Sequence, residues 1–133
     1  MKGFAVVHET DVPRRIAPLR DRDGAVSSFT AMVDEFFPVG DATLELKRVT
    51  LPPAAVVVPH EHDSAEILYV LDGSIVFGAH RCVPGSAVYV GANTRYGFVA
   101  GPDGCTFVNF RGVVGTSIVY PHDANPTSEV GAP

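Results

Sequence analysis

The sequence predicts an all-β fold, a barrel or sandwich built from short strands. From residue 44 onward, turn signals recur roughly every 8–12 residues, as in LPPA (51–54), VPGS (83–86) and GANT (91–94). The runs between these turns are rich in Val, Ile, Tyr, Phe and Thr, which favour strands. No long stretch in this half has the periodicity of a helix. We therefore expect strands joined by short turns.

The expected strands follow one another in chain order from the run LELKRVTL (44–51). Two further turn signals, LDGS (71–74) and AGPDG (100–104), divide the later part of the chain. The runs between the turns are AVVVPHEH, EILYVL, SIVFGA, SAVYVG, YGFVA, CTFVNFRG and GTSIVY. Each is short enough for one strand of a small barrel.

The first 43 residues are less regular. RDRDG (20–24) is typical of a polar turn, and SSFTAMVDEFF (27–37) fits either a helix or a strand. The helical spacing is carried by Phe29, Met32, Val33, Phe36 and Phe37. We favour a strand because the rest of the chain is β, and Pro38 with Gly40 would end either element.

Composition and charge limit the classes of function. The chain has 133 residues, 46% of them hydrophobic and 19% charged, with a formal net charge of −5. This fits one globular domain and gives no electrostatic sign of binding to nucleic acid or to a membrane. The N-terminus does not resemble a signal peptide, so we expect a cytoplasmic protein. Cys82 and Cys105 are then expected to be free thiols.

The segment VPHEHDSAEILYVLDG (58–73) is the strongest functional signal. On a strand, His60 and His62 point to one face with Cα atoms roughly 6–7 Å apart, and Val56 and Val58 are expected to share that face. If the next strand pairs back across the DSA turn, Glu66 lies beside the imidazoles. Two imidazoles and a carboxylate form a set for a divalent metal. The alternative is that the histidines lie on the surface of a turn-rich edge.

These residues also carry a resemblance to a known family. The pattern H-x-H-x3-E-x6-G, filled by His60, His62, Glu66 and Gly73, resembles the first motif of the cupins. Ala54 stands where the family has a leading glycine. The resemblance covers residues 44–120 and implies a jelly-roll β-barrel in which the two histidines and the glutamate bind a metal. We expect a single cupin domain over residues 1–133, with an N-terminal arm or strands (1–43) and a barrel core (44–120). Residues 121–133 are polar and rich in Pro, Gly and Ala, so we expect them to form a loose tail.

The second cupin motif departs from the family pattern. Aligned on Gly85, it places Gly91 at the usual proline and Asn93 at the usual glycine, and Asn93 can adopt a left-handed conformation. Tyr96 replaces the histidine that is the fourth ligand, and Ala100 replaces an asparagine. Three interpretations of Tyr96 remain open: a metal ligand, a hydroxyl facing the metal site or the substrate, or a packed side chain.

Other polar residues interrupt the expected strands. Arg48 and Asn109 are candidate substrate contacts, because a polar side chain in an apolar strand requires a partner. Arg111, at a strand end, is expected to point outward. His8, His80 and His122 are expected at the surface, although His8 would approach the barrel mouth if the N-terminal strand crosses it.

The resemblance implies a metal-dependent enzyme that acts on a small organic molecule. The divalent metal (Fe, Mn, Ni or Zn) would be held by His60, His62 and Glu66, with Tyr96 as a ligand or catalytic acid/base. The chemistry would be either O2-dependent, as in a dioxygenase, or that of a Lewis-acid isomerase, cyclase or lyase. The alternative function is a non-catalytic module that binds or senses a small ligand or a metal. We also expect a homodimer, since small jelly rolls have exposed sheet edges.

Overall fold

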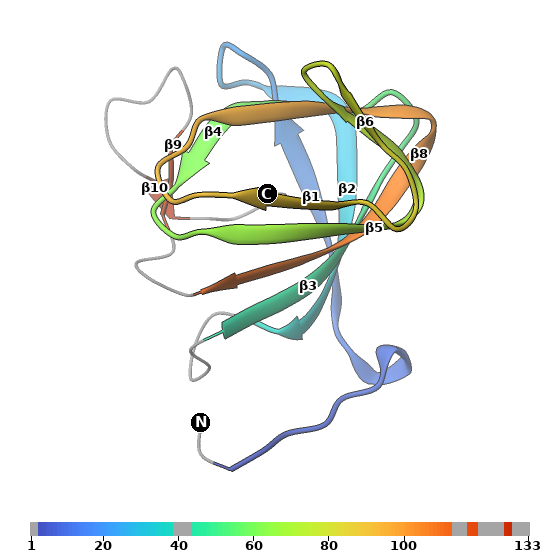
Figure 1. Cartoon of the computed structure of the whole chain (residues 1–133), viewed down its shortest axis with the longest axis vertical. Coiled ribbons are helices and arrows are strands. Elements are labelled where there is room, and N and C mark those ends of the chain that lie inside the picture. The colour runs from blue at the N-terminus through green and yellow to red at the C-terminus, as the bar shows by residue number, and fades with distance from the viewer. Residues whose placement is uncertain (1–2, 39–43, 113–116, 120–126, 129–133) are drawn as a thin grey trace.

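The architecture is described by a computed structural model that covers residues 3–38, 44–112, 117–119 and 127–128 (Figure 1). A 3-10 turn, η1 (Glu9–Asp11), precedes ten strands in the described residues. The strands are β1 (Arg14–Arg20), β2 (Val26–Phe37), β3 (Leu44–Leu51), β4 (Val56–His62), β5 (Glu66–Phe77), β6 (His80–Cys82), β7 (Ala87–Val90), β8 (Tyr96–Gly112), β9 (Ser117–Val119) and β10 (Thr127–Ser128). Within these ranges, no helix has the length and apolar character needed to cross a membrane.

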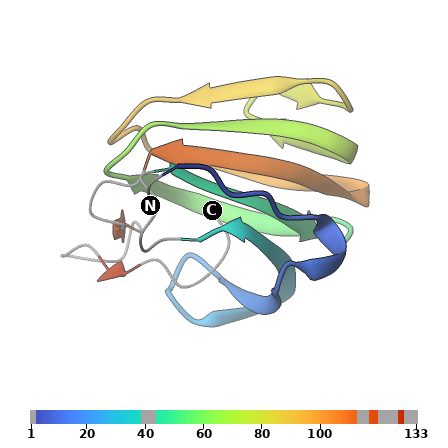
Figure 2. The same ribbon diagram turned by 90° about the horizontal axis from the view of Figure 1, so that it is seen from below.

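All strand pairs are antiparallel, and they close into a jelly-roll barrel (Figures 1 and 2). The main path runs β1-β2-β3-β8-β4-β9-β10, and β5 joins it through β8 while also pairing with β6 and β7. The all-β prediction is confirmed. Residues 27–37 form a strand, as favoured, and lie within β2.

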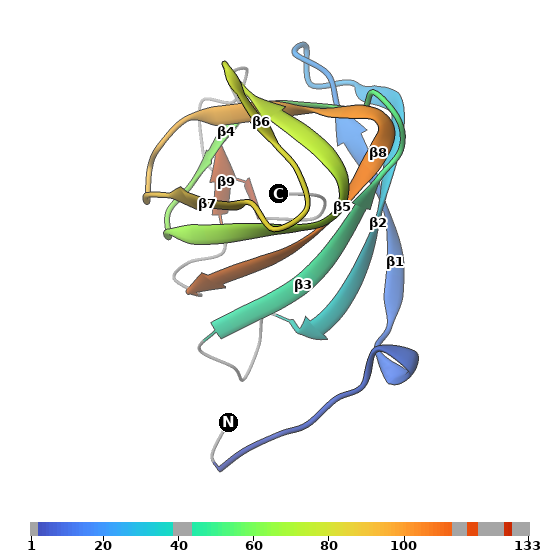
Figure 3. The same ribbon diagram turned by 45° about the vertical axis from the view of Figure 1, so that its right-hand side comes forward.

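Two predicted turns are in fact bends within long strands. β5 runs through residues 71–74 and β8 runs through residues 100–104, so neither segment ends a strand. Gly73 and Gly104 both have positive φ, 71° and 78°, and they lie face to face, because a Cβ on Gly73 would overlap the carbonyl of Gly104. Since the bends coincide, the paired strands curve together from one side of the barrel to the other (Figure 3).

A bulge in β4 sets the direction of the first histidine. Val57 pairs with Phe98 and His60 pairs with Tyr96, so β4 has one residue more than β8 between these pairs. The bulge brings Val57 and His60 onto the same face. The prediction that Val56 and Val58 share the face of His60 was therefore wrong, because it assumed unbroken alternation.

The barrel interior is apolar over much of its length. Val33, Val49, Leu68, Val70 and Phe107 are fully buried within one contiguous cluster. The two cysteines belong to this cluster as free thiols, as predicted, and burial raises the pKa of Cys105 to about 12. Such a thiol is protonated and inert at neutral pH.

Parts of the predicted C-terminal region lie outside the described residues, His122 among them. In the segment 121–133, which was predicted to be a loose tail, the structure describes only β10. These two residues pair with β9, and β9 pairs with β4 beyond the bulge. The single-domain organisation stays a prediction.

The close approach of β4 and β8 at the bulge predicts a large effect of Gly97→Ala. A Cβ at Gly97 would lie 2.7 Å from the carbonyl oxygen of Val57 and 2.8 Å from the nitrogen of Pro59. Because both neighbours are backbone atoms, the strands must separate, and we expect a loss of about 2 kcal/mol in the free energy of unfolding, measured with urea. Gly112→Ala is the matched control, since a Cβ there meets nothing within 4 Å. Equal stability of the two variants would contradict this account.

Candidate functional site

Strand alternation fills one end of the barrel interior with polar side chains. On β3, Glu45 and Lys47 are buried in phase with Val49 and Leu51. On β8, Asn109 and Arg111 are buried in phase with Phe107. Together with residues from β4 and β5 they form what we call the polar cluster: Glu45, Lys47, His60, His62, Glu66, Tyr96, Asn109 and Arg111.

Glu66 is the centre of contacts between strands. It opens β5 and receives hydrogen bonds from the hydroxyl of Tyr96 and from Nδ2 of Asn109, the latter at 2.7 Å. Its Oε1 also lies 3.9 Å from Nε2 of His62. Glu66 lies near the histidines, as expected. The expected cause, pairing of the two strands across the DSA turn, was wrong. In the described strands β4 pairs with β8 and β9, and β5 with β6, β7 and β8, so the DSA segment is not a hairpin turn.

The ring of His60 is oriented by its own strand. Its Nδ1 lies 2.8 Å from the carbonyl oxygen of Val58, which can only accept, so Nδ1 carries the proton and Nε2 the lone pair. Burial lowers the pKa of His60 to about 4. The imidazole is therefore neutral at neutral pH, which is the form that binds metals.

The ring of His62 has the opposite arrangement. Nη1 of Arg111 lies 2.8 Å from Nδ1 of His62, and a guanidinium can only donate. Nδ1 therefore accepts, and the proton of the neutral ring lies on Nε2. Nη2 of Arg111 donates to Glu45 at 2.7 Å, so this buried cation joins β3 to β4.

Lys47 places a second cation in the barrel. Its side chain is 1% exposed, and its Nζ lies 3.8 Å from the Glu45 carboxylate that Arg111 also contacts. Burial, reinforced by the charge of Arg111, lowers the pKa of Lys47 to about 8. The ammonium form still predominates at pH 7.

Tyr96 takes the position that the histidine of the second motif would occupy. Its ring lies 4.6 Å from the ring of His60, and it also lies beside Phe77 and Phe98, at 6.0 and 6.2 Å. The rings of Phe77 and Phe98 are 4.8 Å apart, so the three aromatic rings form one group. The preceding turn is fixed on β4, because the backbone NH of Asn93 donates to the carbonyl of His62 at 2.7 Å. Asn93 has a φ of 59°, as the sequence predicted for a left-handed position.

The side chains of the polar cluster include the ligand types that a divalent metal prefers. In the structure, these side chains contact one another. His60 and His62 lie edge to face at 5.0 Å, and Glu66 adds a carboxylate, a set that suits iron, manganese, nickel or zinc. Among the described residues, however, no group of three His, Cys, Asp or Glu is arranged to hold a metal ion. Glu66 faces Tyr96 and Asn109. Ligation through Nε2 of His62 would require that atom to lose its proton.

Two predictions about arginines are corrected. Arg48 lies on the outer face of β3, where it bonds Asp34 at 3.0 Å and Glu9 at 2.5 Å, so it does not reach the polar cluster as a substrate contact. Arg111 was expected to point outward and instead lies inside. Sequence reasoning also missed Glu45 and Lys47. The signal was present in LELKRVTL, where both share the phase of Val49 and Leu51.

The remaining candidates lie as follows. Asn109 is fully buried in the polar cluster. His8 and His80 are exposed, as expected for surface residues. His8 caps η1 by accepting from the NH of Thr10.

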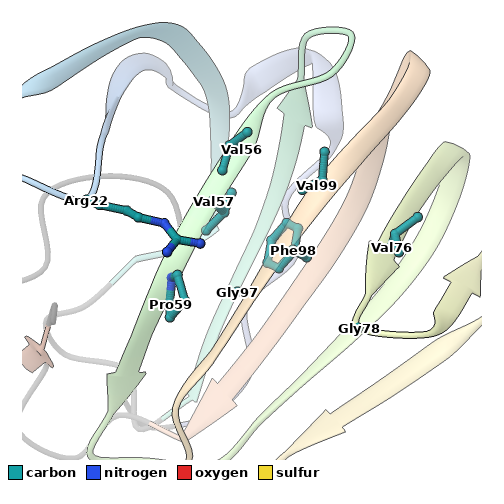
Figure 4. A pocket seen from close by; sticks show the side chains of 9 residues that line it. All are labelled: Arg22, Val56, Val57, Pro59, Val76, Gly78, Gly97, Phe98 and Val99. Atoms are coloured by element: carbon teal, nitrogen blue, oxygen red, sulfur yellow. The ribbon is translucent and has the colours of Figure 1, made fainter.

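A separate pocket of about 260 Å³ lies between the β1–β2 turn and strands β4, β8 and β5 (Figure 4). Arg22 extends across β4 toward Pro59, and most of the other lining side chains are valines. None of these nine residues belongs to the polar cluster. With one arginine and no carboxylate, imidazole or thiol, the lining offers no catalytic acid/base pair.

Solved structures with the same architecture are found in several bacteria. The polyketide cyclase RemF from Streptomyces resistomycificus has a TM-score of 0.68 and 22% identity, covering 90% of this chain and 86% of its own. A sugar phosphate isomerase of the cupin superfamily from Silicibacter pomeroyi has a TM-score of 0.68 and 20% identity, covering 87% and 81%. A candidate acetylacetone dioxygenase from Methylibium petroleiphilum has a TM-score of 0.70 and 13% identity, covering 99% and 91%.

These likenesses show that the chain has the fold of these proteins, and they confirm the jelly-roll barrel that the resemblance in the sequence implied. No protein-family model and no curated protein matches the sequence. The variant second motif, with Tyr96 in place of histidine, distinguishes this barrel from the usual family pattern.

Buried Lys47 predicts a pH dependence of stability. Its pKa is about 8 in the folded protein against a usual value of 10.5. The unfolded chain therefore binds more protons between these two pH values, and the free energy of unfolding should rise by about 3 kcal/mol as pH increases through this window. Urea unfolding of wild type and Lys47→Met across that range tests this. The rise should be absent in the variant, and the same rise in both would contradict the assignment.

Proposed function

We propose that this protein is an enzyme that acts on a small organic molecule at the polar end of the barrel, with a divalent metal held by His60, His62 and Glu66. The observation that carries the proposal is the convergence of two buried imidazoles and a buried carboxylate at one end of an apolar barrel. The similar solved structures described as a cyclase, an isomerase and a candidate dioxygenase support enzymatic use of this fold. Because one fold serves many reactions, the reaction type must come from the site.

The metal, when bound, would supply Lewis-acid or oxygen-activating chemistry. His60 is already oriented for ligation by its bond to Val58. Glu66 would contribute its carboxylate while Asn109 holds that group in place. Arg111 would influence which ring nitrogen of His62 carries the proton, because it donates a hydrogen bond to Nδ1.

Tyr96 is proposed as the acid/base group rather than a ligand. Its hydroxyl donates to Glu66, so it holds a proton at the edge of the metal site. The neighbouring rings of Phe77 and Phe98 restrict its motion. A positioned proton donor of this kind contributes roughly 100-fold or more to a rate.

Asn109 is proposed as a substrate contact. Its Nδ2 is engaged by Glu66, while its buried Oδ1 has no hydrogen-bond partner among the described residues. A buried acceptor without a partner is costly, so a substrate hydroxyl or NH that reached it would bind favourably. This suits an oxygen-rich substrate such as a hydroxy acid, a phenol or the enol of a diketone.

The metal proposal predicts the metal content of the purified protein. His60→Ala and His62→Ala each remove an imidazole, and we expect less than about a tenth of the wild-type metal by elemental analysis, with circular dichroism unchanged. His80→Ala is the control, since His80 is exposed on β6. Full metal content in both site variants would rule out these ligands.

The acid/base role predicts a separate result for Tyr96→Phe. Metal content should stay at the wild-type level, while turnover falls about 100-fold in a screen of diketones, phenols and hydroxy acids with and without oxygen. The Fe(III)-loaded wild type should lack the visible band of a bound phenolate. A band that disappears in the variant would make Tyr96 a ligand. Metal binding with no turnover of any compound would favour the non-catalytic binding module, consistent with the altered second motif.

A further inference from the structure

The hairpin of β1 and β2 meets β4 at a seam of the barrel that has no hydrogen-bonded ladder. Among the described strands, β1 pairs with β2, and β4 pairs with β8 and β9. A hollow of about 250 Å³ lies in this seam, with Phe29 and Val58 in its lining. It adjoins the pocket of Figure 4, because Arg22 and Val56 line both. We call the two hollows together the seam pocket.

A row of three valines gives the seam pocket an apolar wall. Val99 on β8 pairs in register with Val56 on β4 and with Val76 on β5. The three side chains are 42%, 39% and 37% exposed, whereas the neighbouring Val57 and Phe98 are buried in the core. The row therefore faces outward, on the opposite side of these strands from the barrel interior. It offers a ligand apolar surface that is still open to solvent.

The turn between β1 and β2 holds the backbone of Arg22 in place. The carboxylate of Asp21 accepts hydrogen bonds from the NH groups of Asp23 and Ala25, at 2.9 and 3.1 Å. The NH of Asp21 donates to the carbonyl of Ala25 at 2.8 Å. From this turn, the side chain of Arg22 extends across β4 toward Pro59 (Figure 4). The guanidinium therefore stands at the edge of the apolar wall.

The charge of Arg22 is available to a ligand. No carboxylate in the described ranges forms an ion pair with Arg22. The seam pocket contains one other cation, Arg20, and one carboxylate, Asp21, which is occupied by the NH groups of the turn. The lining is thus positive overall, although the whole chain has a net charge of −5. This favours an anionic ligand.

We propose that the seam pocket binds a small organic monocarboxylate, with its carboxylate on Arg22 and its apolar body over the valine row. The planar guanidinium presents NH groups in a geometry that matches a carboxylate. Hollows of about 260 and 250 Å³ have room for a body the size of one aromatic ring, since a closed cavity of about 150 Å³ holds benzene.

The lining also favours one negative charge over two. A phosphate dianion would lose water on entering an apolar wall, and the single unpaired guanidinium of Arg22 would replace little of it. None of the residues of the seam pocket belongs to the polar cluster, so binding here does not require the metal of the proposed function. The site is therefore additional to the one inside the barrel.

NMR titration of the ¹⁵N-labelled protein with 4-fluorophenylacetate tests the site and its location. We expect saturable shifts of the backbone amides of Val56, Val76 and Val99 and of the Nε–H of Arg22. The neutral analogue 4-fluorophenylacetamide should bind at least about 10-fold more weakly, because it lacks the charge. Shifts confined to the polar cluster, equal binding of the amide, or no saturable shift up to about 10 mM, well above a millimolar dissociation constant, would overturn the proposal.

Two pairs of variants test the charge and the apolar wall separately. Arg22→Met should weaken binding of 4-fluorophenylacetate about 10-fold, because a charged hydrogen bond is lost. Arg95→Met is its control, since Arg95 is an exposed cation outside the seam pocket.

Val99→Trp should abolish binding by filling the wall, whereas Ile67→Trp, at an outward position that is also 42% exposed, should not. The amide spectrum of each variant away from the substitution shows whether the fold is kept. Unchanged affinity in folded Arg22→Met or in folded Val99→Trp would overturn the proposal.

Discussion

The buried guanidinium of Arg111 joins the strands that make the polar end of the barrel. It donates to Glu45 on β3 and to His62 on β4 from its own place on β8. A buried charge without partners costs several kcal/mol, so these three strands are held in one relative position. The same contact determines where the proton of His62 lies. The relative position of these strands and the protonation of His62 therefore both depend on the side chain of Arg111.

The barrel divides into an apolar part that stabilises it and a polar part that does not. The cluster around Phe107 and Leu68 is packed and closed, whereas the polar cluster holds two buried cations and two buried carboxylates. Such a network is weak evidence for stability, because desolvation offsets the attraction between the charges. Departures from an apolar interior are expected at functional or strained sites, which agrees with the proposal that this end serves binding or catalysis. The opposite proton positions on His60 and His62 fit that interpretation, since neighbouring groups set each ring separately.

Local patterns predicted the strands and the first motif well, because alternation and turn residues act over a few positions. The His60, His62 and Glu66 set was also recognisable, because its members are close in sequence. The bulge at Val57–His60 was not predictable, since it depends on pairing with β8, some 40 residues away in the chain. The glycines at 73 and 104 looked like turns because the sequence does not show that they face each other. Arg48 lies outside the barrel and Arg111 lies inside it, the reverse of what we expected. The reason is that the phase of the strand alternation, rather than distance from a strand end, decides which side chain is buried.

X-ray absorption spectroscopy of the protein loaded with Zn²⁺ tests the central claim most directly. The account predicts a first shell of nitrogen and oxygen only, with the outer-atom scattering of two imidazole rings, because His60 and His62 both bind. One imidazole would mean that Arg111 keeps the proton on Nε2 of His62 and that the site works without this ligand. A spectrum without imidazole scattering, or with sulfur from Cys82 or Cys105, would contradict the assignment of the polar cluster as the metal site.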